Sequence, residues 1–251
     1  IKYGKRGRST TKPGTLLKKH IPIKTKQWDE ERPGYIEGDT VAHCGGSLSG
    51  EFAYTVDTVD IATGWTEQRA VLGKGETGVL LQLKDIEMSY PFPFLGFDSD
   101  NGGEFINYHA LRYFTQERQK PVEFTRSREY ESNDNAHVEQ KNWTHVRQYL
   151  GYDRLDDPRV VGLMNELYTS EWRLYLNFFL PSVKLLSKER IGSKTVKKHD
   201  LPKTPYQRAL ESKHVSAQKK NILKERFKTL NPFELKKGME KKLARIFNLI
   251  R

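Results

Sequence analysis

The chain has 251 residues, a formal net charge of +11 and 36% hydrophobic residues. This length can bury a full core and leaves room for one domain with appendages. No run of 18 apolar residues occurs, so no membrane span is expected, and the basic N-terminus lacks the apolar stretch of a secretory signal. The single cysteine, Cys44, excludes an intramolecular disulfide and is typical of a reducing compartment. The chain begins at Ile1, which suggests a segment of a longer protein.

The positive charge is concentrated at the two ends. Residues 1–26 hold nine Lys or Arg and no acid, giving +9, and residues 182–251 hold twenty against six acids, giving +14. Because the total is +11, the stretch 27–181 carries −12. An acidic centre between basic ends suits an enzyme that binds cations in its core and a polyanion through its flanks. Lysine-rich ends that are simply solvated would give the same pattern.

The middle of the chain predicts a sheet that begins as a meander. Aromatic and β-branched runs bounded by turn residues predict three strands, at 35–43, 52–59 and 65–71. Apolar residues at helical spacing predict a helix next, at 77–88. A buried parallel strand, a helix and a fifth strand are then expected at 94–97, 104–118 and 122–125. Strands that pair as a meander and then alternate with helices imply an α/β fold with a mixed sheet.

The next predicted helix carries a candidate acid. Asp134 is a suitable N-cap for a helix that runs through Leu150, after a polar, turn-rich stretch. On this helix Glu139 shares a face with Trp143, Val146 and Leu150. The spacing therefore predicts that Glu139 faces the core at the rim of a pocket.

The two ends of the chain differ from its middle. Residues 1–32 contain several Gly and Pro residues and no sustained apolar period, which predicts an extended basic arm. A long core helix is expected at 158–180, and residues 182–251 are predicted to be a flexible basic stretch followed by helices that begin after Thr204 and Asn231. The last helix carries an apolar stripe, which must pack on the core domain or on a partner subunit.

Three carboxylates stand in recognisable local frames. Asp39 lies in the first strand, Asp100 lies in the turn Ser99-Asp100-Asn101-Gly102 after the fourth, and Glu139 follows on a helix with 38 residues between it and Asp100. Carboxylates from separate elements that converge can hold two divalent ions about 3.5–4 Å apart, the arrangement used for in-line attack on phosphodiesters. Mg²⁺ prefers hard oxygen ligands and keeps several waters, so three carboxylates suffice.

These frames resemble those of the DDE transposase and retroviral integrase superfamily, most nearly the integrase-type cores of bacterial insertion-sequence transposases. The resemblance covers roughly residues 33–180, about 60% of the chain. It implies an RNase H-like mixed five-stranded sheet flanked by helices. It further implies a basic linker or arm, an integrase-type catalytic core and a basic helical C-terminal region, at 1–32, 33–181 and 182–251.

The resemblance also implies an activity. The chain would be a Mg²⁺-dependent polynucleotidyl transferase that cleaves DNA and transfers the 3′-end to target DNA during transposition. Asp39, Asp100 and Glu139 would hold two Mg²⁺ ions per active site, with Mn²⁺ able to substitute. The expected partners are double-stranded DNA, at transposon ends and target, and further copies of the chain on that DNA. The expected location is the bacterial cytoplasm, at the nucleoid. A DNA-binding region would precede the basic arm, and a mobile loop would precede the Glu139 helix.

Other interpretations stay open. An RNase H-like nuclease that only hydrolyses would share the fold and the metals, and a transposase-derived DNA-binding protein would lack catalysis. Among competing acids, Asp98 and Glu37 share strand faces with Asp100 and Asp39, but the family frames favour the latter pair. Asp57 is expected to be a turn residue, and so is Asp60.

Five residues are candidates for DNA contact: Asn101, Arg126, Arg128, Lys141 and Arg147. Retroviral integrases carry DNA-binding lysines four and seven residues after the helical Glu, and this chain has Trp143 and Val146 there. The expected DNA binding therefore shifts toward the basic ends of the chain.

Overall fold

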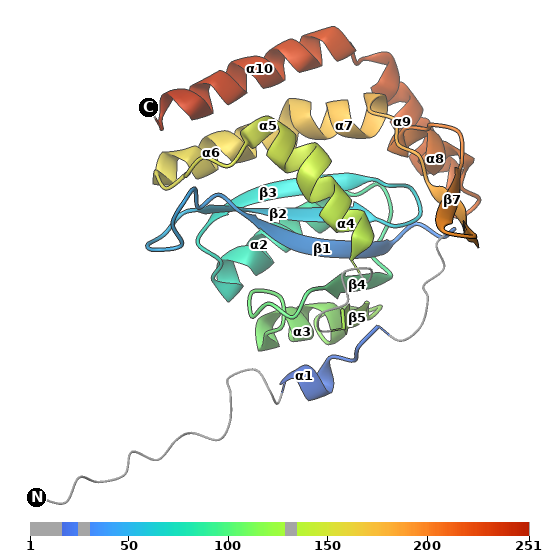
Figure 1. The fold of residues 1–251 in the computed structure, drawn as a ribbon, viewed down its shortest axis with the longest axis horizontal. Helices are drawn as coiled ribbons and strands as arrows, with labels where there is room; N and C mark the ends of the chain where they lie inside the picture. The colour runs from blue at the N-terminus through green and yellow to red at the C-terminus, as the bar shows by residue number, and fades with distance from the viewer. Residues whose placement is uncertain (1–16, 25–30, 129–134, 251) are drawn as a thin grey trace, which may run out of the picture.

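Five strands form one mixed sheet at the centre of the molecule (Figure 1). The structure is a computed structural model that describes residues 17–24, 31–128 and 135–250. The strand order is β3-β2-β1-β4-β5. The strands are β1 (Tyr35–Ala42), β2 (Ala53–Asp60), β3 (Thr66–Leu72), β4 (Gly96–Ser99) and β5 (Glu123–Arg126). Antiparallel pairing joins β1, β2 and β3, whereas β1, β4 and β5 pair in parallel. The predicted RNase H-like α/β fold is therefore confirmed.

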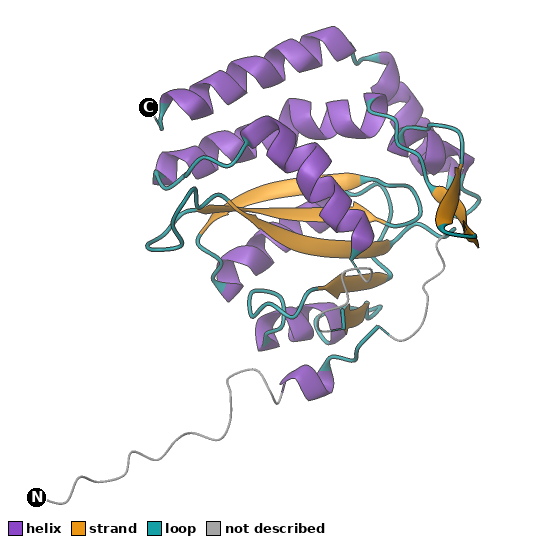
Figure 2. Ribbon diagram, viewed as in Figure 1, coloured by secondary structure: helices purple, strands orange, loops and turns teal. Residues whose placement is uncertain are grey.

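Helices lie on both sides of this sheet (Figure 2). On one side lie α2 (Glu76–Ser89) and α3 (Tyr108–Thr115). The other side is crossed by α4 (Ala136–Lys141), the π-helical segment η1 (Asn142–Arg147) and α5 (Gln148–Leu150). Beside them runs the predicted long core helix, which is divided into α6 (Pro158–Leu167), the π-helical segment η2 (Tyr168–Trp172) and α7 (Arg173–Phe179).

The helix α3 is shorter than the predicted 104–118. It begins only at Tyr108, because the Asn107 side chain accepts a hydrogen bond from the Ala110 amide and caps the helix there. The residues just before this cap form turns that bring Glu104 close to β1, where its carboxylate accepts a hydrogen bond from the Thr40 hydroxyl.

An aromatic cluster fixes β4 in place. Phe97 is fully buried, and its ring lies 4.8–6.1 Å from the ring centroids of Phe105, Phe114 and Phe124. On the neighbouring strand, Gly38 leaves room for the Phe97 ring, because a Cβ at residue 38 would stand 2.5 Å from it. The cluster therefore sets the position of the turn that follows β4 and carries Asp100.

The C-terminal region contains a hairpin that the sequence analysis did not predict. The supposedly flexible stretch before Thr204 forms β6 (Leu185–Ile191) and β7 (Lys194–His199), which pair only with each other. The helices α8 (Pro205–Glu211), α9 (Ala217–Lys228) and α10 (Pro232–Asn248) follow. Thr204 and Asn231 cap α8 and α10 as predicted.

The apolar stripe of α10 packs on the core domain, one of the two predicted alternatives. Met239 and Ile246 are buried in one cluster with Trp172 and Leu176, and α10 lies beside α6 and α7 (Figure 1). An ion pair also joins α10 to the core domain, since Lys242 Nζ lies 2.6 Å from a carboxylate oxygen of Glu171.

Part of the predicted N-terminal arm packs on the domain. Leu17–His20 form one helical turn, α1, and Ile21 is fully buried. Ile23 bridges to Arg126 at the edge of the sheet. The rest of the arm before residue 17, the proposed N-cap Asp134 and most of the predicted mobile loop lie outside the described residues. No helix in the described ranges combines the length and apolar character needed to cross a membrane.

Candidate acidic site

Strand pairing places two of the predicted acids side by side. In the parallel register of β1 and β4, Gly38 pairs with Ser99. Asp39 and Asp100 are the next residues on each strand, and paired strands lie about 4.8 Å apart. Asp98 and Glu37 occupy the preceding position on the same face of the sheet.

Asp39 is held in an environment that disfavours its negative charge. Burial raises the pKa of Asp39 to about 6, and the negative charges of Asp100 and Glu139 add to the effect. Two hydrogen bonds act against this shift: the Thr40 amide donates to Oδ1 at 2.7 Å, and Asn142 Nδ2 donates to Oδ2 at 2.6 Å. A nearby cation would relieve the same penalty.

Asp100 has similar surroundings. Burial raises the pKa of its carboxyl, the charge of Glu104 raises it further, and the Gly102 amide, at 3.0 Å from Oδ1, opposes the shift. A Cβ at Gly102 would stand 2.6 Å from a Glu104 oxygen and 2.9 Å from Asp100 Oδ1, so a side chain at this position would displace one of the two carboxylates. Lys74 Nζ, 3.5 Å from Glu104, supplies a nearby positive charge.

Glu104 belongs to this site, and the sequence analysis missed it. The residue was interpreted as the opening of a helix, but its carboxylate is buried and accepts a hydrogen bond from Thr40 at 3.1 Å. The signal that could have found it is its place four residues after Asp100, in a glycine-rich turn that folds back on the strand end.

The carboxylate of Glu37 holds the start of α4. It accepts hydrogen bonds from the backbone amides of His137 and Val138, at 3.0 and 3.1 Å, and lies 3.0 Å from the His137 ring. A negative charge at a helix N-terminus is favourable, because the free N–H groups and the helix dipole point toward it. Glu37 is therefore engaged in placing the helix that carries Glu139.

The predicted inward face of this helix is confirmed for Val146 and Leu150, which are fully buried, and is wrong for Glu139 and Trp143. Glu139 is exposed and Trp143 is 51% exposed, whereas Val138 and Lys141 are buried. The π-helical segment η1 widens the turn, so the α-helical spacing used for the prediction does not hold past Asn142. Glu139 still lies on the side of Asp39, because Asn142, one turn later, donates to that carboxylate.

Asp57 lies in β2, beside Asp39, rather than in a turn as predicted. It pairs with Asp39 across β1 and β2 and is fully buried. Burial raises the pKa of Asp57 to about 7, and the positive charge of Lys141 opposes the shift. Burial also lowers the pKa of Lys141 to about 8. Asp60 is the last residue of β2 and is fully buried, and its carboxylate accepts hydrogen bonds from Thr63 in the turn that follows.

Most of the predicted DNA contacts are engaged inside the protein. Lys141 is buried near Asp57, and Arg147 donates to the backbone oxygens of Ala42 and Gly151. Asn101 and Arg126 bond to each other. These four candidates therefore serve the fold, and Arg128 alone among the five is exposed.

The three predicted ligands are not brought together equally. Asp39 lies on β1 and Asp100 directly follows the neighbouring strand β4, and the charges of Asp100 and Glu139 both raise the pKa of Asp39. Within the described residues, however, no three His, Cys, Asp or Glu side chains stand close enough to form a metal-binding group.

Comparison with known proteins adds a relative without an assigned function. No protein-family model matches the chain. The chain is 40% identical over 195 residues to the "Uncharacterized protein y4rM" of Sinorhizobium fredii (strain NBRC 101917 / NGR234). The similar stretch covers 77% of this chain and 55% of that protein, so the chain spans about half the length of the relative it matches.

Proposed function

We propose that this chain is the catalytic core of a DDE-type DNA transposase or integrase. The observation that carries the proposal is the adjacent placement of Asp39 and Asp100 on an RNase H-like sheet, with Glu139 nearby on α4, the helix that follows β5. The sequence frames around all three acids and the fold point to the same class of reaction. The reaction would be cleavage of a DNA strand and transfer of its 3′-end to target DNA.

The donor chemistry fits hard divalent cations. Asp39 and Asp100 supply adjacent oxygen ligands with raised pKa values, which is the environment that a cation would stabilise. Together with Glu139 they would hold Mg²⁺, or Mn²⁺ in its place. Bound ions of this kind activate a water or a DNA 3′-hydroxyl and stabilise the leaving oxygen.

Other residues of the chain would orient these ligands. The Asn142 amide fixes one oxygen of Asp39, and the Thr40 amide fixes the other. Glu37 anchors the first turn of α4 over the strand that carries Asp39, so the same strand sets the positions of both Asp39 and Glu139. The proposed partners are double-stranded DNA and further copies of the chain, at the bacterial nucleoid in the cytoplasm.

The test is a DNA cleavage and joining assay. The full-length protein would be incubated with Mg²⁺, a target plasmid and labelled duplexes made from the DNA that borders its gene. Nicked ends followed by joined products are expected, and Asp100→Asn should abolish both while DNA affinity stays within about twofold. Nicks without joining would identify a nuclease, and binding without any product would identify a DNA-binding protein; either result would refute the proposal.

A further inference from the structure

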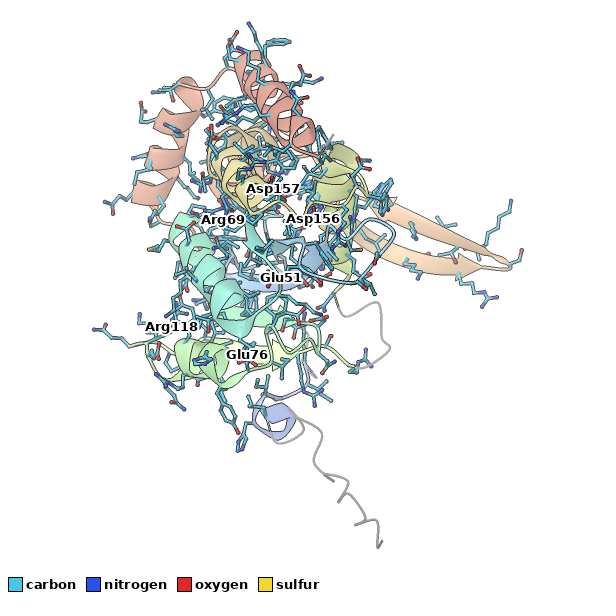
Figure 3. All side chains as sticks on the ribbon, turned by 90° about the vertical axis from the view of Figure 1, so that its left-hand side faces the viewer. Glu51, Arg69, Glu76, Arg118, Asp156 and Asp157 are labelled. Carbon is cyan, nitrogen blue, oxygen red and sulfur yellow. The ribbon has the colours of Figure 1, made fainter. Side chains whose placement is uncertain are left out.

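The hairpin β6–β7 stands apart from the rest of the molecule. Its two strands are joined by the two-residue turn Gly192-Ser193, and Gly192 has a φ of +62°, which glycine adopts readily. Figure 3 shows the hairpin, in pale orange, projecting away from the body of the protein. Every residue of the two strands is exposed except Ser187, which is partly buried.

The hairpin strands and turn carry a strong positive charge that the protein does not neutralise. They contain one acid, Glu189, and five cations, namely Lys188, Arg190, Lys194, Lys197 and Lys198. None of these five forms an ion pair with a carboxylate in the described part of the chain. The cations of α10 differ, since Lys242 and Arg245 pair with Glu171 and Glu166.

The strand register gathers like charges on one face. Lys188 lies directly opposite Lys197, and the neighbouring pair on that face is Arg190 with Thr195. Like charges directly opposite each other destabilise a strand pair, and an isolated two-stranded hairpin is only marginally stable in water. A polyanion bound to this face would remove the repulsion.

The base of the hairpin is fixed to the domain. Arg208 of α8 donates to Asp200 Oδ2 at 2.6 Å and to the Ser182 oxygen at 2.9 Å. Asp200 in turn accepts a hydrogen bond from the Lys184 amide at 2.6 Å. These contacts connect both strands to α8, so the arm is oriented before it meets a partner, which lowers the entropy cost of binding.

We propose that this hairpin is a DNA-binding arm, and that the Lys188, Arg190 and Lys197 face contacts the phosphates of duplex DNA. The major groove of B-DNA, about 12 Å wide, admits a two-stranded ribbon, whereas the major groove of duplex RNA is too narrow for side chains to read. The choice of DNA as the polyanion rests on the proposed function. The exposure, charge and register of the hairpin are independent of that proposed function.

The experiment compares two variants with the same loss of charge. The first carries Lys188→Gln, Arg190→Gln and Lys197→Gln, and the control carries Lys219→Gln, Lys224→Gln and Arg226→Gln on the exposed surface of α9. Affinity for a fluorescent duplex is measured by anisotropy at several salt concentrations, in EDTA so that no cleavage occurs. Each neutralised phosphate contributes a slope of about −0.9 in log affinity against log salt. The hairpin variant should therefore flatten the slope by about two to three and bind at least tenfold more weakly at about 0.1 M salt.

The outcomes separate this inference from the proposed function. The control should stay within about twofold of the wild type, and both variants should keep the wild-type melting temperature, since all six side chains are exposed. Equal losses in the two variants, an unchanged slope in the hairpin variant, or a loss seen only with duplex RNA or phosphatidylserine vesicles would overturn the inference. A hairpin-specific loss of DNA binding in a protein that never cleaves DNA would instead refute the proposed function alone.

Discussion

The substitution Glu37→Gln tests whether this buried carboxylate places the helix that carries Glu139. The side chain keeps its size and loses the charge that receives the His137 and Val138 amides. Hydrogen bonds to charged groups contribute about 1.5–3 kcal/mol and neutral ones about 0.5–1.5, so each amide should lose about 1 kcal/mol. The new NH₂ group must also turn toward a donor inside the protein, which costs about 1–3 kcal/mol. The two amides and the NH₂ group together give an expected loss of stability of about 3–5 kcal/mol.

The loss should be local as well as global. Hydrogen exchange of the amides in α4 should accelerate more than the global free energy of unfolding from urea titration predicts. DNA cleavage should fall with it, because Glu139 lies on this helix. Glu67→Gln is the matched control: Glu67 is also buried, lies on β3, and is held by Arg173 at 2.7 Å. It should lower global stability without selective exchange in α4. Equal protection of α4 in both variants would refute the assigned role of Glu37.

Three further outcomes follow from the structure. In EDTA, the free energy of unfolding should fall as the pH rises from 5 to 8. The pKa of Asp39 is about 6 in the folded state and about 3.9 in the unfolded state, so the folded state binds more protons between these values and loses that advantage as the pH rises. Thermal melts with saturating Mg²⁺ should show a smaller fall. Lys242→Gln should cost about 1 kcal/mol in urea titrations through the lost bond to a glutamate of η2, whereas the exposed Lys241→Gln should cost nothing measurable. Gly38→Ala should cost about 1–3 kcal/mol by overpacking, against no comparable loss for Gly46→Ala, whose Cβ would meet open space.

Much of the sheet could be predicted because its signals are local. The runs of β-branched and aromatic residues identify β1, β2 and β3, and the Asp-Asn-Gly turn after a short apolar strand marks the end of β4. The parallel pairing of β1 with β4 then follows from the meander and the helix between them. Asp39 and Asp100 could be placed side by side for this reason.

The placement of Glu139 depends on features that periodicity does not encode. The widened turn of η1 changes which side chains face inward, and the spacing of Val146 and Leu150 does not predict this π-helical segment. The anchor of the helix is Glu37, a hundred residues away in the sequence, so its role emerges only from the folded structure.

The hairpin β6–β7, by contrast, could have been predicted from the sequence. Gly192-Ser193 between two short strand-like runs is a recognised hairpin signal, but the surrounding lysines favoured the prediction of a flexible stretch.

The partners of the competing acids decide which carboxylates are available to a ligand. Glu37 is occupied by the backbone of α4, and the oxygen Oδ1 of Asp98 accepts from the Thr125 hydroxyl at 2.5 Å. Asp57 is fully buried, accepts from Gln68 at 2.7 Å and faces the charge of Lys141. Each of these three acids therefore has an internal partner, although the buried Oδ2 of Asp57 accepts no hydrogen bond from the described residues.

Asp39 and Asp100 are bound differently. Their hydrogen bonds come from adjacent backbone amides and from Asn142, and neither forms an ion pair with a lysine or arginine within the described residues. Burial raises the pKa of both carboxyls, the charges of Asp100 and Glu139 raise that of Asp39 further, and the charge of Glu104 raises that of Asp100, so keeping both ionised costs stability. The proposed site for hard cations would offset that cost, because a bound cation stabilises the ionised form of both carboxylates.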